Sequence, residues 1–342
     1  MGTQLEPYVA AVEAAMLDAL QAPSPEVEPL YGAMRYHLGW ADDHFRPVRA
    51  PRGKRVRPLF CLLSCQAVGG DWRAAVPLAA GLELVHNFSL IHDDIEDKSA
   101  LRRHRPAVWA QWGVPQAINI GDAMFSLARL TVHWLAAQGT PAEIVLAALQ
   151  RLEETSLALC RGQYLDMAFE TQAEVSLARY LEMIDGKTAA LLACAAETGA
   201  LLGAGLAGPH ASFRRFGREL GLAFQIVDDL LGIWGEPAIT GKPAAADVRS
   251  RKKTLPILHA LQVLGARGEG ELARLMAQPA LDEGDVAAAI RCIEAAGARE
   301  HAAAMAEQHT QQGLAALEQA VPPSPARRAL RDLALRLVGR DR

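Results

Sequence analysis

The sequence predicts an all-α fold, a single large helical bundle that forms one domain over residues 1–342. Apolar residues recur at the helical period along most of the chain. Alanine and leucine are in excess, aromatic residues make up only 6% of the chain, and runs of β-branched residues are scarce. Hydrophobic residues account for 51% and charged residues for 22%, which excludes disordered, collagenous and membrane-embedded chains.

The breaks in the helical pattern are too short to serve as interdomain linkers. They lie at 23–25, 47–53, 69–71, 139–141, 208–209 and 322–325. A length of 342 residues would suggest two domains of roughly 100 to 200 residues each, but single cores also reach this size. Because the chain has no tandem repeat and no low-complexity tract, we expect one domain.

Charge, cysteine content and hydropathy narrow the functional class. The net charge is −4, so neither nucleic acid nor an anionic membrane is an expected partner. The five cysteines contain no C-x-x-C pair, which argues against a disulfide framework or a zinc site and indicates a cytoplasmic protein. The longest apolar stretch, 189–208, is interrupted by Glu197 and several glycines, so we expect a buried helix and no membrane span.

The first candidate site along the chain is a basic segment, GKRVRP at 53–58, which follows a proline-rich connection and opens an apolar helix. Lys54 and Arg57 are three residues apart and can share a helix face. Backbone N–H groups at a helix N-terminus favour anions. The segment therefore indicates an anion site, although a solvated surface is the alternative.

An acidic cluster ends the next apolar helix, LVHNFSLIHDDIED at 84–97. Asp93, Asp94 and Asp97 fall on about one helical face, where like charges repel unless water or cations neutralise them. A solvated acidic face would explain a lone D-D-x-x-D. Since the preceding turns are apolar, the acids are expected at the mouth of a buried region, where hard oxygen ligands favour Mg²⁺.

Further basic residues follow. A basic run at 102–105 begins five residues after Asp97 and favours local charge pairing or phosphate binding over a solvated surface. Lys187 and Thr188 stand on an otherwise apolar helix, where the lysine either pairs or snorkels to the surface. We expect a long ordered loop at 233–253, which carries Lys242 and a basic run at 251–253.

A second acidic pair, Asp228 and Asp229, repeats the arrangement after another apolar run. Magnesium usually binds through a few carboxylates together with waters and substrate phosphates. Two acidic clusters with basic segments nearby therefore predict a diphosphate held between them by bridging Mg²⁺.

The ordered set of motifs resembles the trans-polyprenyl diphosphate synthases, which elongate an allylic diphosphate with isopentenyl diphosphate. The matching pieces are GKRVRP (53–58), HNFSLIHDDIED (86–97), RRHRP (102–106), GQYLD (162–166), GKT (186–188), FQIVDD (224–229), GKP (241–243) and KKTLP (252–256). The resemblance implies the isoprenoid synthase fold with a deep central cavity, and a homodimer.

The resemblance also implies roles for individual residues. Three Mg²⁺ ions bridged by diphosphate would be held by Asp93, Asp94, Asp97, Asp228 and Asp229. The allylic substrate would contact Arg102, Lys187, Thr188, Gln225 and Lys242, and its diphosphate would contact Lys252. Isopentenyl diphosphate would be bound by Lys54, Arg57, His86 and Arg103. Gln163 and Asp166 would support the metal site.

The implied reaction is ionisation, condensation and elimination without a protein nucleophile. Metal ions and cations would stabilise the leaving diphosphate, while the Thr188 carbonyl and the Gln225 amide oxygen would protect the allylic cation. Two departures from the family pattern bear on this. Gly232 replaces the usual third aspartate of the second motif, and His104-Arg105 departs from the commoner R-R-G-x-P form.

The resemblance also implies that product length depends on Phe88 and Ser89, which lie five and four residues before the first acidic motif. Five helical residues span roughly 7.5 Å, so Phe88 would close the tunnel about one to two isoprene units below the metals. This pattern resembles enzymes that make the C20 product, geranylgeranyl diphosphate, with C15 farnesyl diphosphate as the alternative. Phe88 as an ordinary core aromatic remains open.

Other functions share parts of the pattern. A terpene cyclase would share the fold and one aspartate-rich motif, but it has no need for the second diphosphate site suggested by Lys54, Arg57 and His86. A non-catalytic subunit of a heteromeric synthase, or a helical scaffold, is kept open by Gly232.

Overall fold

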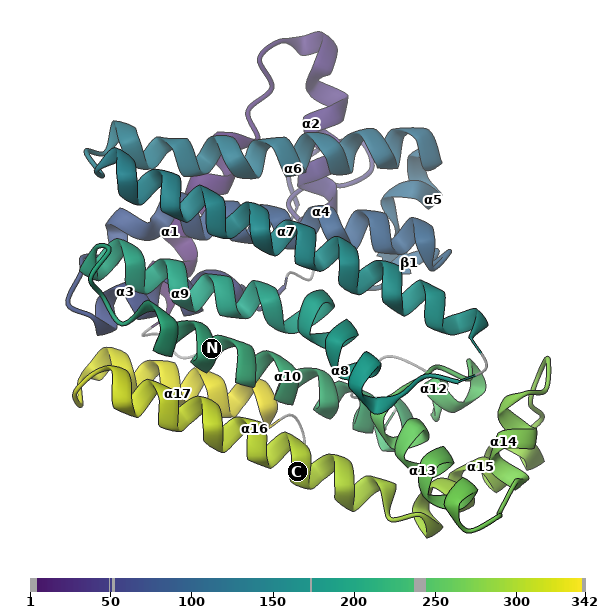
Figure 1. Cartoon of the computed structure of the whole chain (residues 1–342). Helices are drawn as coiled ribbons and strands as arrows, with labels where there is room; N and C mark the ends of the chain where they lie inside the picture. Colours follow the sequence, from purple (N-terminus) through teal and green to yellow (C-terminus); the bar gives the residue numbers. More distant parts are fainter. Residues whose placement is uncertain (1–4, 49, 51–52, 173, 237–243, 340–342) are drawn as a thin grey trace. The chain divides into compact units, whose positions relative to one another are not determined.

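The protein is described by a computed structural model that covers residues 5–48, 50, 53–172, 174–236 and 244–339. Over these ranges the chain consists of helices joined by turns and by one short antiparallel hairpin (Figure 1). The predicted all-α fold class is confirmed.

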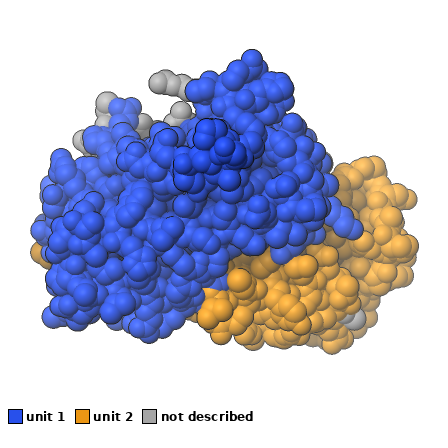
Figure 2. All heavy atoms as spheres, turned by 90° about the horizontal axis from the view of Figure 1, so that it is seen from above, with its two compact units in different colours: residues 1–156, 194–211, 323–330 blue, residues 157–193, 212–322, 331–342 orange. Residues whose placement is uncertain are grey.

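The chain forms two compact units, shown in blue and orange in Figure 2. Unit 1 comprises Met1–Ser156, Cys194–Ala211 and Pro323–Leu330, and unit 2 comprises Leu157–Ala193, Ser212–Pro322 and Arg331–Arg342. The expectation of one domain over residues 1–342 stays a prediction.

The first part of unit 1 contains the elements α1 (Glu6–Ala19), η1 (Pro25–Val27), α2 (Glu28–His37), α3 (Val56–Ala67), η2 (Trp72–Ala75), α4 (Val76–Glu96), β1 (Leu101–Arg102), β2 (Arg105–Pro106), α5 (Val108–Trp112) and α6 (Val114–Ala137). Helix α4 is enclosed on every side between Pro77 and Val85. A helix that is buried all round is expected to be apolar all round, and Glu83, the charged residue in this stretch, is paired with Arg55. Helix α4 packs along α6, where Phe88 meets Phe125 with ring centroids 4.5 Å apart.

Unit 2 is built mainly from the later helices. They are α8 (Leu177–Ile184), η3 (Asp185–Ala189), α10 (His210–Trp234), α12 (Ala246–Arg249), α13 (Leu255–Ala266), α14 (Glu271–Met276), α15 (Glu283–Ala295) and α16 (Ala298–Ala320). The helices α7 (Ala142–Thr171), α9 (Ala190–Ala204) and α17 (Pro325–Val338) have residues in both units, and the first two residues of α10 belong to unit 1. One apolar core of unit 2 joins α8, α10, α13 and α16 through Tyr180, Ile226, Leu258 and Ala302.

The segment predicted as a long loop, 233–253, is partly helical. Helix α10 continues to Trp234, and α12 forms one helical turn at Ala246–Arg249. The prediction of an uninterrupted loop was therefore wrong for its described residues, because Ile233 and Val248 are buried in an apolar cluster of unit 2. Lys242 lies outside the described residues.

One helix in the described part of the chain is long and apolar enough to cross a membrane by length and composition. It spans 72–96, and 72% of its most apolar window is buried inside the structure. The core helix of a folded protein has the same character. The apolar stretch singled out from the sequence instead forms α9, whose residues 191–200 are buried.

Candidate active site

The first acidic cluster lies at the C-terminal end of α4. Asp93 is half-buried, and Asp97 is exposed and caps the helix. Asp94 is 1% exposed and accepts hydrogen bonds from Arg102, at 2.6 Å from Nη2 and 3.0 Å from Nε. Burial raises the pKa of Asp94, and the Arg102 hydrogen bonds oppose that rise. The middle acid therefore anchors Arg102, while the outer two lie nearer to solvent.

Arg102 and Arg103 belong to a β-hairpin whose turn consists of two residues. Arg103 and His104 form the turn with φ of 53° and 63°, in the left-handed region. A tight hairpin turn with two left-handed residues matches the twist of its strands, and histidine is among the residues enriched in that region. The departure at His104 from the commoner glycine is thus compatible with the turn.

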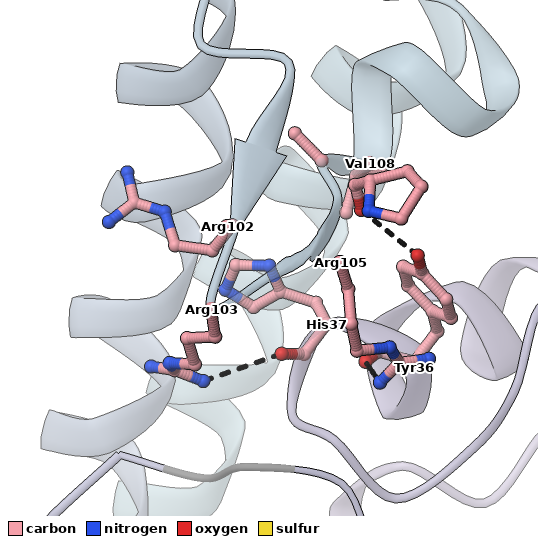
Figure 3. A pocket seen from close by; sticks show the side chains of 8 residues that line it. Tyr36, His37, Arg102, Arg103, Arg105 and Val108 are labelled. Atoms are coloured by element: carbon pink, nitrogen blue, oxygen red, sulfur yellow. Dashed lines mark hydrogen bonds between the residues drawn. The ribbon is translucent and has the colours of Figure 1, made fainter. Parts of the chain in front are cut away.

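Helix α2 holds this hairpin in place, as Figure 3 shows. Arg105 donates to the carbonyl oxygens of Tyr36 and Ala41 at 3.1 and 2.7 Å, and its guanidinium lies over the Tyr36 ring. The Tyr36 hydroxyl donates in return to the Pro106 carbonyl at 2.9 Å. These bonds offset the backbone strain of the turn and fix the base from which Arg102 and Arg103 extend.

Three of the four residues predicted to bind isopentenyl diphosphate come together in unit 1. The pKa of His86 lies well below its usual range because of burial first, and then because of the nearby charges of Arg57 and Arg103. Its imidazole is therefore neutral at pH 7 and can offer an N–H to an anion beside the two guanidinium groups. The fourth residue, Lys54, is exposed in the loop before α3.

The loop that carries Lys54 is anchored by Arg55. This residue is left-handed, with φ of 50°, and is 2% exposed. Its guanidinium donates to Glu83 of α4 at 2.8 Å and also pairs with Glu13 of α1 at 3.3 Å. The loop also lies against the hairpin, because a Cβ at Gly53 would approach Arg103 Nη2 to 3.2 Å.

His37 is a site residue that sequence reasoning missed. It is 7% exposed and lines a cavity of about 10 Å³ together with Arg102 and Arg103 (Figure 3). Burial, followed by the charges of Arg103, Arg102 and Arg55, holds its pKa well below the usual range. The Arg103 guanidinium donates to its carbonyl oxygen at 3.5 Å. A lone histidine near a helix end gives no sequence signal that it will lie beside these arginines.

In unit 2, two of the predicted lysines meet at one carboxylate. Lys187 Nζ lies 2.5 Å and Lys252 Nζ lies 4.0 Å from Asp166 Oδ2. Burial would raise the pKa of Asp166, but the two lysines outweigh it and the net shift is downward. The contacts of Asp166 with these lysines orient the two ammonium groups. The predicted support of the metal site by Asp166 and Gln163 stays a prediction.

Lys187 and Thr188 lie in a π-helical segment, η3, which precedes α9. Such segments are rare in proteins, but those that occur are often found at functional sites. The backbone of this segment lies against Gly162 of α7, where a Cβ would come within 2.2 Å of the Lys187 nitrogen. Glycine is therefore required at 162, and the GQYLD and GKT motifs form one structural element.

The second acidic cluster lies on α10. Asp228 is half-buried, whereas Asp229 is 3% exposed and makes several hydrogen bonds. It accepts from the Tyr180 hydroxyl, from the Leu255 backbone N–H at 3.0 Å and from Gln225 Nε2 at 3.2 Å. Burial raises the pKa of Asp229 to about 6, although these donors oppose the rise.

Gly232, the departure noted in the second motif, faces the Asp247 carboxylate. A Cβ at position 232 would lie 2.0 Å from Asp247 Oδ2 and 2.4 Å from its Cγ. Position 232 has no room for a side chain while the Asp247 carboxylate occupies this space. Asp247 was not predicted, because its distance of nineteen residues from Asp228 along the chain follows no helical spacing.

The carboxylates suit Mg²⁺ by their chemistry. All are oxygen donors, as this ion prefers, and Asp93, Asp97 and Asp228 are each at least partly exposed. Among the described residues, no three His, Cys, Asp or Glu side chains form a cage for a metal ion. Magnesium commonly completes its shell with waters and substrate phosphates, so the carboxylates of each cluster, taken by themselves, fit a Mg²⁺ site that waters and substrate complete.

The two residues predicted to set product length lie on α4. Phe88 is 8% exposed and packs against Phe125 and, edge to face, against His92. Ser89 is half-buried, and its hydroxyl donates to the His86 carbonyl at 2.9 Å. Their role in product length stays a prediction.

Comparison with known proteins relates this arrangement to a family. The polyprenyl synthetase family model matches residues 40–293. The chain is 44% identical over 322 residues to the (2E,6E)-farnesyl diphosphate synthase of Mycobacterium tuberculosis, covering 93% of this chain and 87% of the relative. It is 42% identical over 297 residues to the geranylgeranyl diphosphate synthase of the same organism, covering 86% and 83%.

Solved structures agree with the sequence comparison. A polyprenyl synthetase from Streptomyces coelicolor A3(2) superposes with a TM-score of 0.88 at 37% identity, over 97% of this chain and 98% of that one. A geranylgeranyl pyrophosphate synthetase from Pyrococcus horikoshii gives 0.86 at 32% identity, over 99% and 98%. The chain therefore has the all-α isoprenoid synthase fold and belongs to the polyprenyl synthetase family of trans-prenyltransferases.

Proposed function

We propose that this enzyme condenses isopentenyl diphosphate with an allylic diphosphate to give C20 geranylgeranyl diphosphate. The observation that carries the proposal is a cluster of basic side chains in each unit, since the reaction needs places for two diphosphate groups. Arg57, His86 and Arg103 gather in unit 1, and Lys187 and Lys252 meet at Asp166 in unit 2. A terpene cyclase acts on one diphosphate and has no need for both clusters.

The cluster in unit 1, with Lys54, is proposed to bind isopentenyl diphosphate. Arg57 and Arg103 supply charge, and neutral His86 supplies an N–H donor, so the cluster holds the anion without adding a further buried cation. The buried Arg55–Glu83 pair keeps the loop with Lys54 at this place.

The allylic diphosphate is proposed to contact Arg102, Lys187, Lys242 and Lys252. Asp93, Asp97 and Asp228 would hold Mg²⁺, with Asp247 supplying the carboxylate that position 232 lacks and with Asp94 and Asp229 positioning their neighbours. Bound Mg²⁺ would neutralise charge on the leaving diphosphate.

In the proposed reaction the lysines and arginines stabilise negative charge on the diphosphate oxygen as the allylic C–O bond breaks. The isopentenyl double bond then attacks the allylic carbon to form the new C–C bond. The condensed carbocation then loses a proton to the released diphosphate, which leaves the new double bond of the product. Thr188 and the Gln225 amide lie together, 2.7 Å apart, where their dipoles would shield the allylic cation.

Incubation of the purified protein with Mg²⁺, labelled isopentenyl diphosphate and dimethylallyl, geranyl or farnesyl diphosphate tests the proposal. Elongation to a C20 diphosphate, identified by mass spectrometry, is the expected result. Absence of elongation with every primer would contradict it. A C15 end product would favour the second candidate, farnesyl diphosphate synthesis, which the 44% identity to an enzyme of that name supports.

Substitution of Phe88 tests the basis of the C20 assignment. Phe88 and Phe125 fill the space between α4 and α6, so Phe88→Ala removes an aromatic ring at the proposed end of the prenyl tunnel. We expect a product distribution longer by one or two C5 units, measured by mass spectrometry. Phe45→Ala, which removes an aromatic that stacks on Trp112, is the matched control. An unchanged distribution in Phe88→Ala would remove this residue from the control of chain length.

The working form is proposed to be a cytoplasmic homodimer. Helix α6 exposes the apolar side chains of Val114 and Ile118, which are 40% and 44% exposed and lie one turn apart on one face of the helix. An apolar helix face of this kind supports self-association. Light scattering coupled to size-exclusion chromatography separates a dimer from the 36.8 kDa monomer.

A further inference from the structure

A chain of hydrogen bonds links Tyr180 of α8 to Thr188 of η3 through two residues of α10. The Tyr180 hydroxyl donates to Asp229 Oδ2, Gln225 Nε2 donates to Asp229 Oδ1 at 3.2 Å, and the Thr188 hydroxyl donates to Gln225 Oε1 at 2.7 Å. Tyr180 is 1% exposed, Asp229 3% and Thr188 7%. All four residues belong to unit 2.

The ends of this chain fix the orientation of the Gln225 amide. An ionised carboxylate only accepts hydrogen bonds, so Asp229 requires Gln225 to present its NH₂ group. The carbonyl end of the amide must then point to Thr188, whose hydroxyl donates to it. A carbonyl oxygen has two lone pairs, so Gln225 Oε1 keeps one for positive charge in the allylic site.

Asp229 is itself held by Tyr180. Of its two oxygens, Oδ1 accepts from Gln225, while Oδ2 accepts from the Tyr180 hydroxyl and from the Leu255 backbone N–H. The Leu255 bond fixes one point of the carboxylate, and the hydroxyl supplies a second donor at the same oxygen. Without that hydroxyl, the carboxylate can rotate about its Cβ–Cγ bond and carry the Gln225 amide with it.

We propose that Tyr180 is a positioning residue of the allylic site, which acts through Asp229 to hold Gln225 and Thr188 in the orientation that shields the allylic cation from water. The inference rests on the proposed prenyl transfer. When shielding fails, water adds to the allylic carbon after the C–O bond has broken, a proton is released, and the products are the allylic alcohol and inorganic diphosphate.

The test is the fraction of consumed allylic diphosphate that ends as alcohol, measured by chromatography with labelled geranyl diphosphate. Tyr180→Phe removes only the hydroxyl, and we expect the alcohol fraction to rise at least threefold and kcat to fall about tenfold. The KM for isopentenyl diphosphate should stay within twofold. A partition ratio does not depend on the amount of folded enzyme, so reduced stability of the variant cannot imitate the result.

Two further variants make the test specific. Tyr164→Phe is the matched control, because this tyrosine of unit 2 is 72% exposed, and it should leave the alcohol fraction unchanged. In a Gln225→Leu background, Tyr180→Phe should add no further alcohol, because its effect passes through Gln225. Equal partition in Tyr180→Phe and the wild type, or additive effects in the double variant, would overturn the inference. The proposed function is judged separately by elongation in the wild type.

Discussion

At the residue scale, the two acidic clusters of this protein differ at one position. The first cluster is Asp93, Asp94 and Asp97, whereas the same spacing from Asp228 ends at Gly232. The Asp247 carboxylate occupies the space that a side chain at 232 would need, with Oδ2 2.0 Å from the position of a Cβ. The glycine and Asp247 therefore depend on each other sterically.

An exchange of these two residues tests whether Asp247 supplies the missing carboxylate. Asp247→Ala should raise the Mg²⁺ concentration for half-maximal activity about tenfold, within the range for residues that support metal ligands. Gly232→Asp alone should lower the melting temperature because of the clash, and the double variant Gly232→Asp, Asp247→Ala should recover most of the Mg²⁺ affinity. Binding of Mn²⁺ in the presence of inorganic diphosphate, followed by electron paramagnetic resonance, provides a readout independent of turnover.

The matched control is Asp332→Ala, an exposed aspartate on α17. A wild-type response to Mg²⁺ and Mn²⁺ in Asp247→Ala would refute the role of Asp247.

At the scale of elements, the loop before α3 depends on α4 through one buried ion pair. Arg55 and Glu83 are 1% and 3% exposed at their side chains, with 2.8 Å between Nη1 and Oε1. Removal of one partner from a buried pair leaves a charge without full compensation, which costs about 3–5 kcal/mol. Glu13 also lies near Arg55, at 3.3 Å, and moderates this loss.

Glu83→Gln is therefore expected to lower the free energy of unfolding by about 2–4 kcal/mol in urea titrations. Because the loop carries Lys54 and precedes Arg57, the KM for isopentenyl diphosphate should rise while the KM for the allylic substrate stays within twofold. Glu96→Gln, at an exposed position on the same helix, is the control for loss of charge. Equal changes in both KM values would show a general loss of structure instead of a loop effect.

Much of this organisation could be predicted, and the rest depends on contacts that sequence spacing does not encode. The helical period predicted the all-α fold, and the resemblance of the motifs to a known family singled out Arg57, His86 and Arg103. The Tyr180–Asp229 and Arg55–Glu83 contacts join residues 49 and 28 positions apart, which no local pattern relates. The π-helical turn at Asp185–Ala189 lies against Gly162, and no pattern in the sequence predicted the turn or this contact.

At the scale of the whole molecule, the net charge of −4 conceals concentrated local charge. Arg55, Arg102 and Arg103 surround His37 in unit 1, while the carboxylates of Asp94 and Glu83 pair with two of these arginines. Carboxylates inside the fold thus balance part of the positive charge of these arginines. Such an arrangement predicts that stability responds to the protonation of buried histidines more than to overall charge.

Burial and neighbouring arginines lower the pKa of both His37 and His86 in the folded protein, while both are normal when it unfolds. Below the usual histidine pKa of about 6.5, the unfolded chain therefore binds more protons than the folded one. The free energy of unfolding should be constant above about pH 7.5 and should fall with pH below about 6.5, by at most about 1.4 kcal/mol per pH unit for each histidine.

Asp229, whose pKa is raised to about 6, acts in the opposite direction around and below that value. Asp229 begins to take up a proton above pH 6, so urea titrations between pH 7.5 and 6.5 limit its contribution, and comparison with histidine variants isolates the histidines. His37→Asn should reduce the slope by about half, and His133→Asn, at an exposed position on α6, should leave it unchanged. A slope in His37→Asn equal to that of the wild type would show that His37 does not resist protonation in the folded enzyme.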